Sequence, residues 1–410
     1  MKKSLIKVIV LLVIVALFAV LGVSGCEAAT TATTAAVETT AAAAETTTTA
    51  AAETTTIAPA KKLVFVDTNS GANFQLFFNE KVIPEAASKL GIDVEYVVSS
   101  GPEIVERMKA WGSDQEGDIH FLLLKQDTLG DMFKNNIAVL KVYPDLTSKV
   151  PNITKISKQN LEVNDAVQLD GKAALFWRSQ MAICYDSTKI PNPPKSWKEF
   201  YERREEFKGH IGMLRADAKS SGGRRMIYGF LNAFGVDFKK PYAELKESKE
   251  WKDAWVKFEE FSKYFFKPLA SEPPILYQQF KSGDVWITEY ALDYTLWSRD
   301  QGLLPESVKG LFFQEGDTSG ADALLVIPEK IGAAEKESAL IFMNFLLSDE
   351  TQIDMITTMW QYTGTDIEDK IPASVWDNIP KWSVAEKSRI KFENADAQTY
   401  IMENGDSHIK

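Results

Sequence analysis

Short apolar runs alternate with helical segments from residue 61 onward. The runs at 62–66, 92–98 and 118–123 predict three strands. Residues 73–90 and 103–111 lie between them and, bounded by turn residues, predict two helices. This order of strands and helices predicts an α/β fold, with an open, mostly parallel sheet flanked by helices.

The turns after these three strands are rich in short polar side chains. Ligands of open α/β sheets lie beyond the carboxyl ends of the strands. The turns 68–71, 99–101 and 125–127 are therefore expected along one edge of the sheet. Their candidate ligand contacts are Thr68, Asn69, Ser70, Ser99, Ser100 and Gln126.

The second half of the chain repeats this alternation less regularly. About 350 residues follow residue 60, more than one compact core usually holds, so we expect two lobes. Further strands are predicted at 173–185, 209–214, 285–288 and 323–327, and further helices at 197–207, 224–234, 250–266, 333–347 and 349–359.

The N-terminus predicts export. Lysines precede an uncharged apolar run at 8–23, which is short for a spanning helix but suits a signal peptide. The following Val23-Ser24-Gly25-Cys26 resembles the lipobox of bacterial lipoproteins. We expect cleavage after residue 25 and a lipid on Cys26, which anchors the chain to the outer face of the cytoplasmic membrane, in the periplasm or at the cell surface. An ordinary signal peptide and an uncleaved anchor are the alternatives.

Residues 26–60 are expected to form a disordered tether that carries the lipidated cysteine. The part after Cys26 is nearly all Ala and Thr and has little apolar surface to bury. If Cys26 is lipidated, Cys184 has no partner for an intrachain disulfide. Because Cys184 lies in an apolar run, we expect a small buried side chain.

The formal net charge of −11 argues against nucleic acid, whose recognition depends on neutralising phosphates with Lys and Arg. The acidic balance is a weak indication of neutral or cationic ligands. No segment after the leader is long and apolar enough to span a membrane.

A turn of small residues, 220–223, precedes the predicted helix 224–234. A helix N-terminus leaves backbone N–H groups unpaired and adds partial positive charge, which suits an anionic group or a sugar hydroxyl. The candidate contacts here are Ser221, Gly222, Gly223 and Arg224, the last as a fork of donors. The alternative is a plain helix cap.

Aromatic side chains and carboxylates suggest a different ligand. Aromatic faces bind cations and the C–H face of sugars, and the candidates are Trp177, Trp286 and Tyr290. Glu289 and Asp293 are four residues apart and would share a helix face that holds an ammonium group. Core packing and a solvated helix face are the alternatives. This set and the turn at 220–223 conflict unless the solute carries both charges or is a polyol.

Enzyme signatures are scarce in the sequence. Its three histidines lack metal-ligand spacing such as H-E-x-x-H, and there is neither a G-x-S-x-G elbow nor a G-x-x-x-x-G-K-[ST] phosphate loop. We therefore expect no enzyme, no metal and no cofactor. A glycosidase with a carboxylate pair remains one alternative. A surface adhesion or structural lipoprotein is another.

Several phrases, in this order, resemble those of bacterial extracellular solute-binding proteins of family 1, the receptors of ABC importers. The similarity covers residues 61–375, and the phrases lie at 117–120, 177–189, 193–200, 280–286, 320–324 and 339–352. It implies a monomeric receptor for a small polar solute, such as a sugar, a polyamine-like or thiamine-like cation, or another organic solute. A membrane permease would receive the solute.

The resemblance also implies a type II periplasmic-binding-protein-like fold, with two α/β lobes that close on the ligand like a hinge. Crossings between the lobes are expected at 176–181, 287–291 and 319–323, which adds Arg178 and Asp322 to the candidate contacts. The expected division gives residues 61–177 and 289–320 to lobe one. Lobe two then holds residues 178–288 and 321–410.

Overall fold

The computed structural model describes residues 58–112, 115–165, 167–391 and 394–410. Its largest sheet has six strands in the order β12-β6-β11-β3-β1-β2. The strands are β1 (Lys62–Asp67), β2 (Asp93–Val98), β3 (Phe121–Leu124), β6 (Ala174–Arg178), β11 (Ala323–Val326) and β12 (Tyr362–Thr363). As predicted, β1 is parallel to β2 and β3, whereas β11 is antiparallel to β3 and β6.

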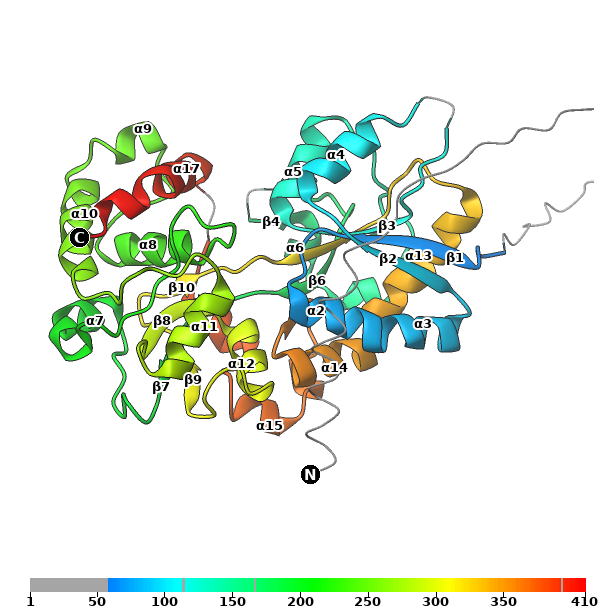
Figure 1. The fold of residues 1–410 in the computed structure, drawn as a ribbon. Coiled ribbons are helices and arrows are strands. Elements are labelled where there is room, and N and C mark those ends of the chain that lie inside the picture. The colour runs from blue at the N-terminus through cyan, green and yellow to red at the C-terminus, as the bar shows by residue number, and fades with distance from the viewer. Residues whose placement is uncertain (1–57, 113–114, 166, 392–393) are drawn as a thin grey trace, which may run out of the picture. The chain divides into compact units, whose positions relative to one another are not determined.

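Helices cover this sheet (Figure 1), and aromatic side chains fill the core between them. The helices include α2 (Ala72–Phe77), α3 (Ile83–Leu90), α4 (Gly101–Lys109), α5 (Gln126–Lys134), α13 (Ala333–Leu346) and α14 (Asp349–Met359). Phe65 of β1 lies at the centre, with the rings of Phe78, Phe121 and Phe342 at centroid distances of 5.2, 5.5 and 5.6 Å. Edge-on contacts between rings are favourable beyond the area that they bury. We call this sheet with its helices lobe one.

A second sheet has three antiparallel strands in the order β8-β7-β9. These are β7 (Met181–Asp186), β8 (Ile287–Ala291) and β9 (Val308–Leu311). The helices that belong with it include α7 (Trp197–Glu202), α8 (Gly222–Ala233), α10 (Lys249–Ser262), α11 (Pro273–Ser282), α12 (Leu292–Asp300) and α17 (Ala395–Asn404). Trp197, Phe200, Phe230 and Phe261 fill a separate core. We call this part lobe two.

The chain passes between the two lobes three times, and the first two passages are neighbours. Ser179 and Gln180 join β6 to β7, and residues 319–322 lead from β10 (Asp317–Thr318) to β11. Gln180 and Ser319 form an isolated antiparallel bridge, so these two connections are paired. After β12 the chain returns, and β13 (Arg389–Ile390) pairs with β10.

The strand pairing corrects the expected division of the lobes. Residues 287–291 do not cross, because β8 pairs along its whole length with β7 of lobe two. Residues 289–320 therefore lie with lobe two. Residues 323–363, which were expected in lobe two, contribute β11 and β12 to the sheet of lobe one. The division was wrong because a strand that pairs within one lobe and a strand that crosses between lobes have the same apolar pattern in sequence.

The leader at 1–25, Cys26 and most of the tether lie outside the described residues. Ala60, expected in the tether, is held by the folded part: its N–H donates to Ala334 O at 3.1 Å, and its carbonyl accepts from Ser338 Oγ at 2.7 Å. Cys184 is buried and free, as predicted. In the described part of the chain, no helix has both the length and the apolar character that a membrane crossing needs.

Candidate functional site

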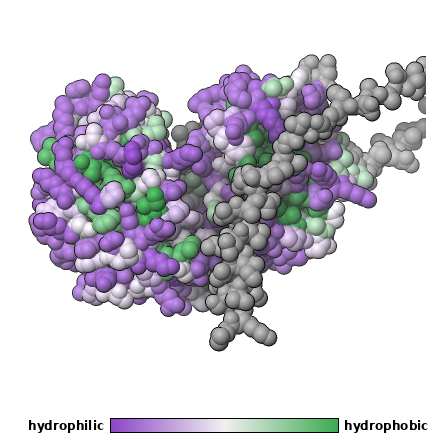
Figure 2. Space-filling view, viewed as in Figure 1, coloured by the Kyte–Doolittle hydropathy of each residue, from purple (hydrophilic) through white to green (hydrophobic). Residues whose placement is uncertain are grey.

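A cavity of about 1070 Å³ is lined by residues of both lobes. Ligand pockets typically measure about 300–1,000 Å³, so the space suits a small solute and some water. Figure 2 shows the surface hollowed between the part that carries α17 and the part that carries α4 and α5, with mostly hydrophilic residues on both rims.

Lobe one contributes to the cavity wall residues that directly follow its strands, at the edge of the sheet where the sequence predicted them. The buried carboxylate of Asp67 ends β1 and accepts from the N–H groups of Asn69 and Ser70 at 2.8 and 2.9 Å and from Tyr96 Oη at 2.6 Å. This network fixes the turn, and Asn69 lines the cavity. Gln126 begins α5, lines the cavity and donates to Asp165 Oδ2 at 3.1 Å.

Lobe two contributes the start of α8. A Cβ on Gly222 would lie 2.7 Å from Cε2 of Tyr290, and one on Gly223 would lie 2.2 Å from Leu214 O. The glycines therefore let the helix start approach an aromatic ring and a neighbouring backbone. Tyr290 Oη lies 3.1 Å from Ser220 Oγ, which fixes the ring in the wall of the cavity.

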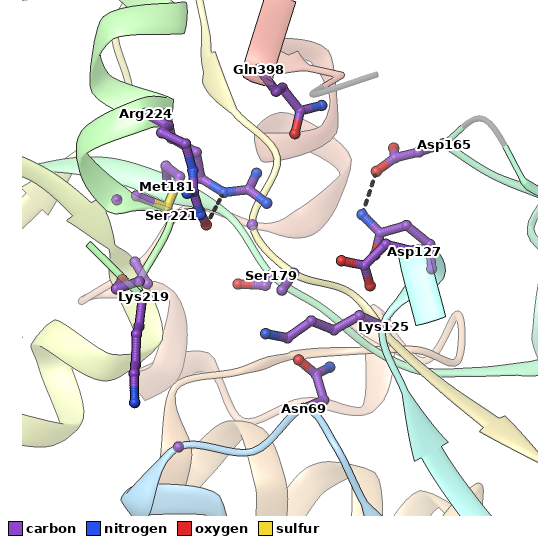
Figure 3. Close-up of a pocket in the computed structure, with 18 of the residues that line it drawn as sticks. Asn69, Lys125, Asp127, Asp165, Ser179, Met181, Lys219, Ser221, Arg224 and Gln398 are labelled. Atoms are coloured by element: carbon purple, nitrogen blue, oxygen red, sulfur yellow. Dashed lines mark hydrogen bonds between the residues drawn. The ribbon is translucent and has the colours of Figure 1, made fainter. Parts of the chain in front are cut away.

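Eight of the predicted contacts line the cavity: Asn69, Gln126, Trp177, Ser221, Gly222, Arg224, Tyr290 and Asp293. They come from the ends of β1, β3, β6 and β8 and from the first turns of α8 and α12. Figure 3 shows Asn69 and Lys125 from lobe one and Lys219, Ser221 and Arg224 from lobe two around a common space, with Gln398 of α17 beside them.

Predicted contacts in the turns of lobe one that do not line the cavity have other partners. Ser99 Oγ donates to Glu103 Oε2 at 3.0 Å. Ser100 caps α4: its side chain accepts from the N–H of Glu103, and the Glu103 carboxylate accepts from the N–H of Ser100. The side chain of Thr68 donates to Leu123 O at 3.3 Å. Ser70 supports the turn through its N–H.

The remaining predicted contacts outside the cavity wall belong to lobe two or to the crossings. Trp286 stacks on His210 at a centroid distance of 3.6 Å. Arg178 forms an ion pair with Asp366 and lies over the ring of Trp382. Gly223 packs on backbone, as described above. The other two, Glu289 and Asp322, are buried carboxylates.

Glu289 and Asp293 do not share a helix face, because Glu289 lies in β8 and Asp293 in the first turn of α12. Burial, followed by the nearby Asp317 carboxylate, raises the pKa of Glu289 well above its ordinary value. Asp322 is fully engaged: Oδ1 accepts from Ser179 N at 2.9 Å, and Oδ2 accepts from Asn164 Nδ2 at 3.0 Å and Arg389 Nη2 at 2.7 Å.

Asp293 is a buried carboxylate in the cavity wall. The residue is 9% exposed, and Oδ1 has no hydrogen-bond partner among the described residues. Burial raises its pKa to about 7, an effect only partly offset by the N–H groups of Asp293 and Tyr294. A group poised between charged and neutral forms in a cavity is typical of a functional site.

We expect Asp293→Asn to change the pH dependence of stability. An unfolded Asp titrates near pH 4, so between about pH 4 and 7 the folded state binds more protons and loses stability as the pH rises. The amide cannot ionise, so the variant should gain about 2–3 kcal/mol relative to the native protein between pH 5 and pH 8. Urea unfolding at both pH values measures this, with Asp127→Asn, an exposed carboxylate of the same cavity, as control. An equal change in the free energy of unfolding between the two pH values in both variants would contradict the raised pKa of Asp293.

The sequence did not single out several residues that line the cavity. They include Lys125, Asp165, Ser179, Met181, Lys219, Tyr294, Gln398, Thr399 and Met402. Lys125 lies in a turn that was expected at this edge of the sheet. Gln398, Thr399 and Met402 lie on α17, more than 90 residues after α12, and no local pattern predicts that this helix returns to the cavity. Within the described ranges, no group of three or more His, Cys, Asp or Glu side chains is arranged to hold a metal ion.

Comparison with known proteins gives one family match. The family model described as bacterial extracellular solute-binding protein matches residues 78–371, which confirms the resemblance found in the sequence. The match ends before α17. No curated protein sequence matches this chain.

Solved structures share the fold at low sequence identity. A spermidine/putrescine ABC transporter substrate-binding protein from Streptococcus pneumoniae is 14% identical, with a TM-score of 0.66 over 86% of this chain and 100% of that one. A cyclic alpha-maltosyl-1,6-maltose binding protein from Arthrobacter globiformis is 12% identical, with a TM-score of 0.61 over 86% and 93%. A fructose-6-phosphate-bound periplasmic binding protein from Actinobacillus pleuropneumoniae is 12% identical, with a TM-score of 0.56 over 85% and 99%.

Proposed function

Since the chain belongs to the bacterial extracellular solute-binding proteins, we propose that it is the receptor of an ABC importer and captures a small polar solute in the cavity between its two lobes. The cavity carries the proposal. Its wall combines residues of both lobes and includes charged side chains such as Lys125 and Arg224. A solute that contacts both walls would stabilise the arrangement in which the walls lie close together.

The proposed mechanism is binding without chemistry. The paired connections at Ser179–Gln180 and 319–322 serve as the hinge between lobe one and lobe two. A ligand shifts such an equilibrium only by its difference in affinity for the two states. The solute therefore closes the lobes because it contacts both walls, and the closed form docks on a membrane permease. We propose that the chain acts as a monomer and leaves the solute chemically unchanged.

The proposed location follows from the family and the N-terminal sequence. The family is extracellular, so the protein functions outside the cytoplasm. We propose that Cys26 carries the lipid that holds the chain on the outer face of the cytoplasmic membrane, and that the Ala/Thr-rich segment after it is a tether. The folded part would then remain near the permease that it serves.

A thermal-shift screen tests the proposed function. The purified protein is heated with sugars, polyamines, thiamine-like cations, amino acids and organic anions in turn. We expect one class to raise the melting temperature by several degrees, because a ligand that binds only the folded state stabilises it. The solute is then recovered and analysed by chromatography. Chemical conversion of the solute would contradict the receptor function.

A further inference from the structure

Three cationic side chains of the cavity wall have no carboxylate partner among the described residues. Lys125, Lys219 and Arg224 line the cavity, and among the described residues none of the three has a carboxylate within ion-pair distance. Lys125 precedes α5 in lobe one, whereas Lys219 and Arg224 flank the start of α8 in lobe two. Arg224 is half-buried, and this burial lowers the pKa of its guanidinium.

Each carboxylate of the same wall has a hydrogen-bond or ion-pair partner, or a pKa that burial raises. Asp131 forms an ion pair with Lys134 at 3.0 Å. Asp165 accepts from Gln126, and burial and the Asp322 carboxylate raise its pKa, an effect that Arg389 and Arg225 only partly offset. The carboxylate of Asp127 accepts from Thr128 N at 2.7 Å. Asp293, as described above, is poised between its charged and neutral forms.

The start of α8 adds to the positive field. This helix has 12 residues, and its N-cap residue, Ser221, makes no side-chain cap to the first turn. Ser221 Oγ instead accepts from Arg225 Nε at 2.9 Å. The first N–H groups of a helix and its dipole favour a negative group. Lys219 precedes this helix start, Arg224 lies in its first turn, and both line the cavity.

We propose that the solute carries an anionic group, a carboxylate or a phosphate, and that Lys125, Lys219 and Arg224 bind this group at the start of α8. The inference rests on the proposed receptor function and names the class of its solute. Because Lys125 belongs to lobe one and Arg224 to lobe two, an anion between them contacts both lobes. The same group would thus both select the solute and favour closure.

Two pairs of probes test the proposal, each differing in one charged group. The first pair is fructose 6-phosphate and fructose, and the second is 4-aminobutyrate and 1,4-diaminobutane. A fifth probe is inorganic phosphate at a few millimolar, with ionic strength held constant by sodium chloride. Melting temperature and isothermal titration report binding to the full chain. We expect phosphate and at least one anionic member to raise the melting temperature more than its partner does.

Variants connect the effect to the named side chains. Hydrogen bonds to charged groups contribute about 1.5–3 kcal/mol, so Arg224→Gln and Lys125→Gln should each weaken binding of the anionic probe about tenfold or more. Lys239→Gln removes an exposed lysine of lobe two that does not line the cavity, and should change affinity less than threefold. Circular dichroism confirms that each variant is folded.

Two results would overturn the inference. One is stabilisation by fructose or 1,4-diaminobutane that equals or exceeds that by the anionic partner. The other is an effect of phosphate that Arg224→Gln and Lys125→Gln leave unchanged. Either result leaves the receptor function intact, because the first indicates a neutral or cationic solute and the second indicates that other side chains bind the phosphate. Chemical conversion of a probe would instead contradict the receptor function itself.

Discussion

Asp322→Ala is expected to lower the free energy of unfolding by about 3–5 kcal/mol, because breaking a buried ion pair leaves the other charge uncompensated. Asp322 is 3% exposed, and the side chain of its partner Arg389 is 10% exposed. The substitution also removes the acceptor for Ser179 N, in the connection between the lobes. Urea unfolding, followed by tryptophan fluorescence, measures the loss.

Two variants serve as controls for Asp322→Ala. Asp322→Asn keeps the shape and one acceptor oxygen, and should lose less stability than the alanine variant. Asp118→Ala breaks an exposed ion pair with Arg107, and should cost less than about 1 kcal/mol. A loss below 1 kcal/mol for Asp322→Ala would show that the Asp322 network does not hold the crossing together.

Trp177→Ala should also cost about 3–5 kcal/mol of stability, as large aromatic truncations in cores do. The side chain is 3% exposed, stacks on Phe74 at a centroid distance of 4.1 Å, and donates from Nε1 to Ala321 O at 3.1 Å. Because Trp177 also lines the cavity, we expect solute binding to weaken by more than about 1 kcal/mol.

Trp177→Phe separates packing from hydrogen bonding. It keeps an aromatic face beside Phe74 and loses the bond to Ala321, which should cost about 1 kcal/mol. The measurements are urea unfolding and titration with a solute found in the screen. Unchanged affinity in a folded Trp177→Ala variant would remove this residue from the binding surface.

The local pattern of apolar residues predicted the bounds of the strands better than it predicted which strands pair. The apolar runs place β1 and β2 within a residue or two of their observed bounds. The predicted helix at 73–90 is interrupted by a π-helical turn at Phe78–Val82, which inserts a residue into the helical hydrogen-bonding pattern without changing the hydrophobicity. The crossing expected at 287–291 was wrong, because strand pairing depends on distant segments.

The lining of the cavity was predictable where sheet geometry determines it. Asn69 and Gln126 follow β1 and β3, which are neighbours inside the sheet, and both line the cavity. Ser99 and Ser100 follow β2, the edge strand, where Ser100 caps α4 and Ser99 Oγ donates to Glu103. The approach of α17 depends on tertiary contacts such as Asp406 accepting from Ala216 N at 2.7 Å, which no local sequence signal reports.

Native mass spectrometry of the purified protein with a solute that raises its melting temperature tests the receptor function most directly. The account predicts a mass increase of one intact solute molecule per chain, and release of the same molecule when the protein is denatured. Release of a converted product, or a covalent adduct that survives denaturation, would contradict binding without chemistry.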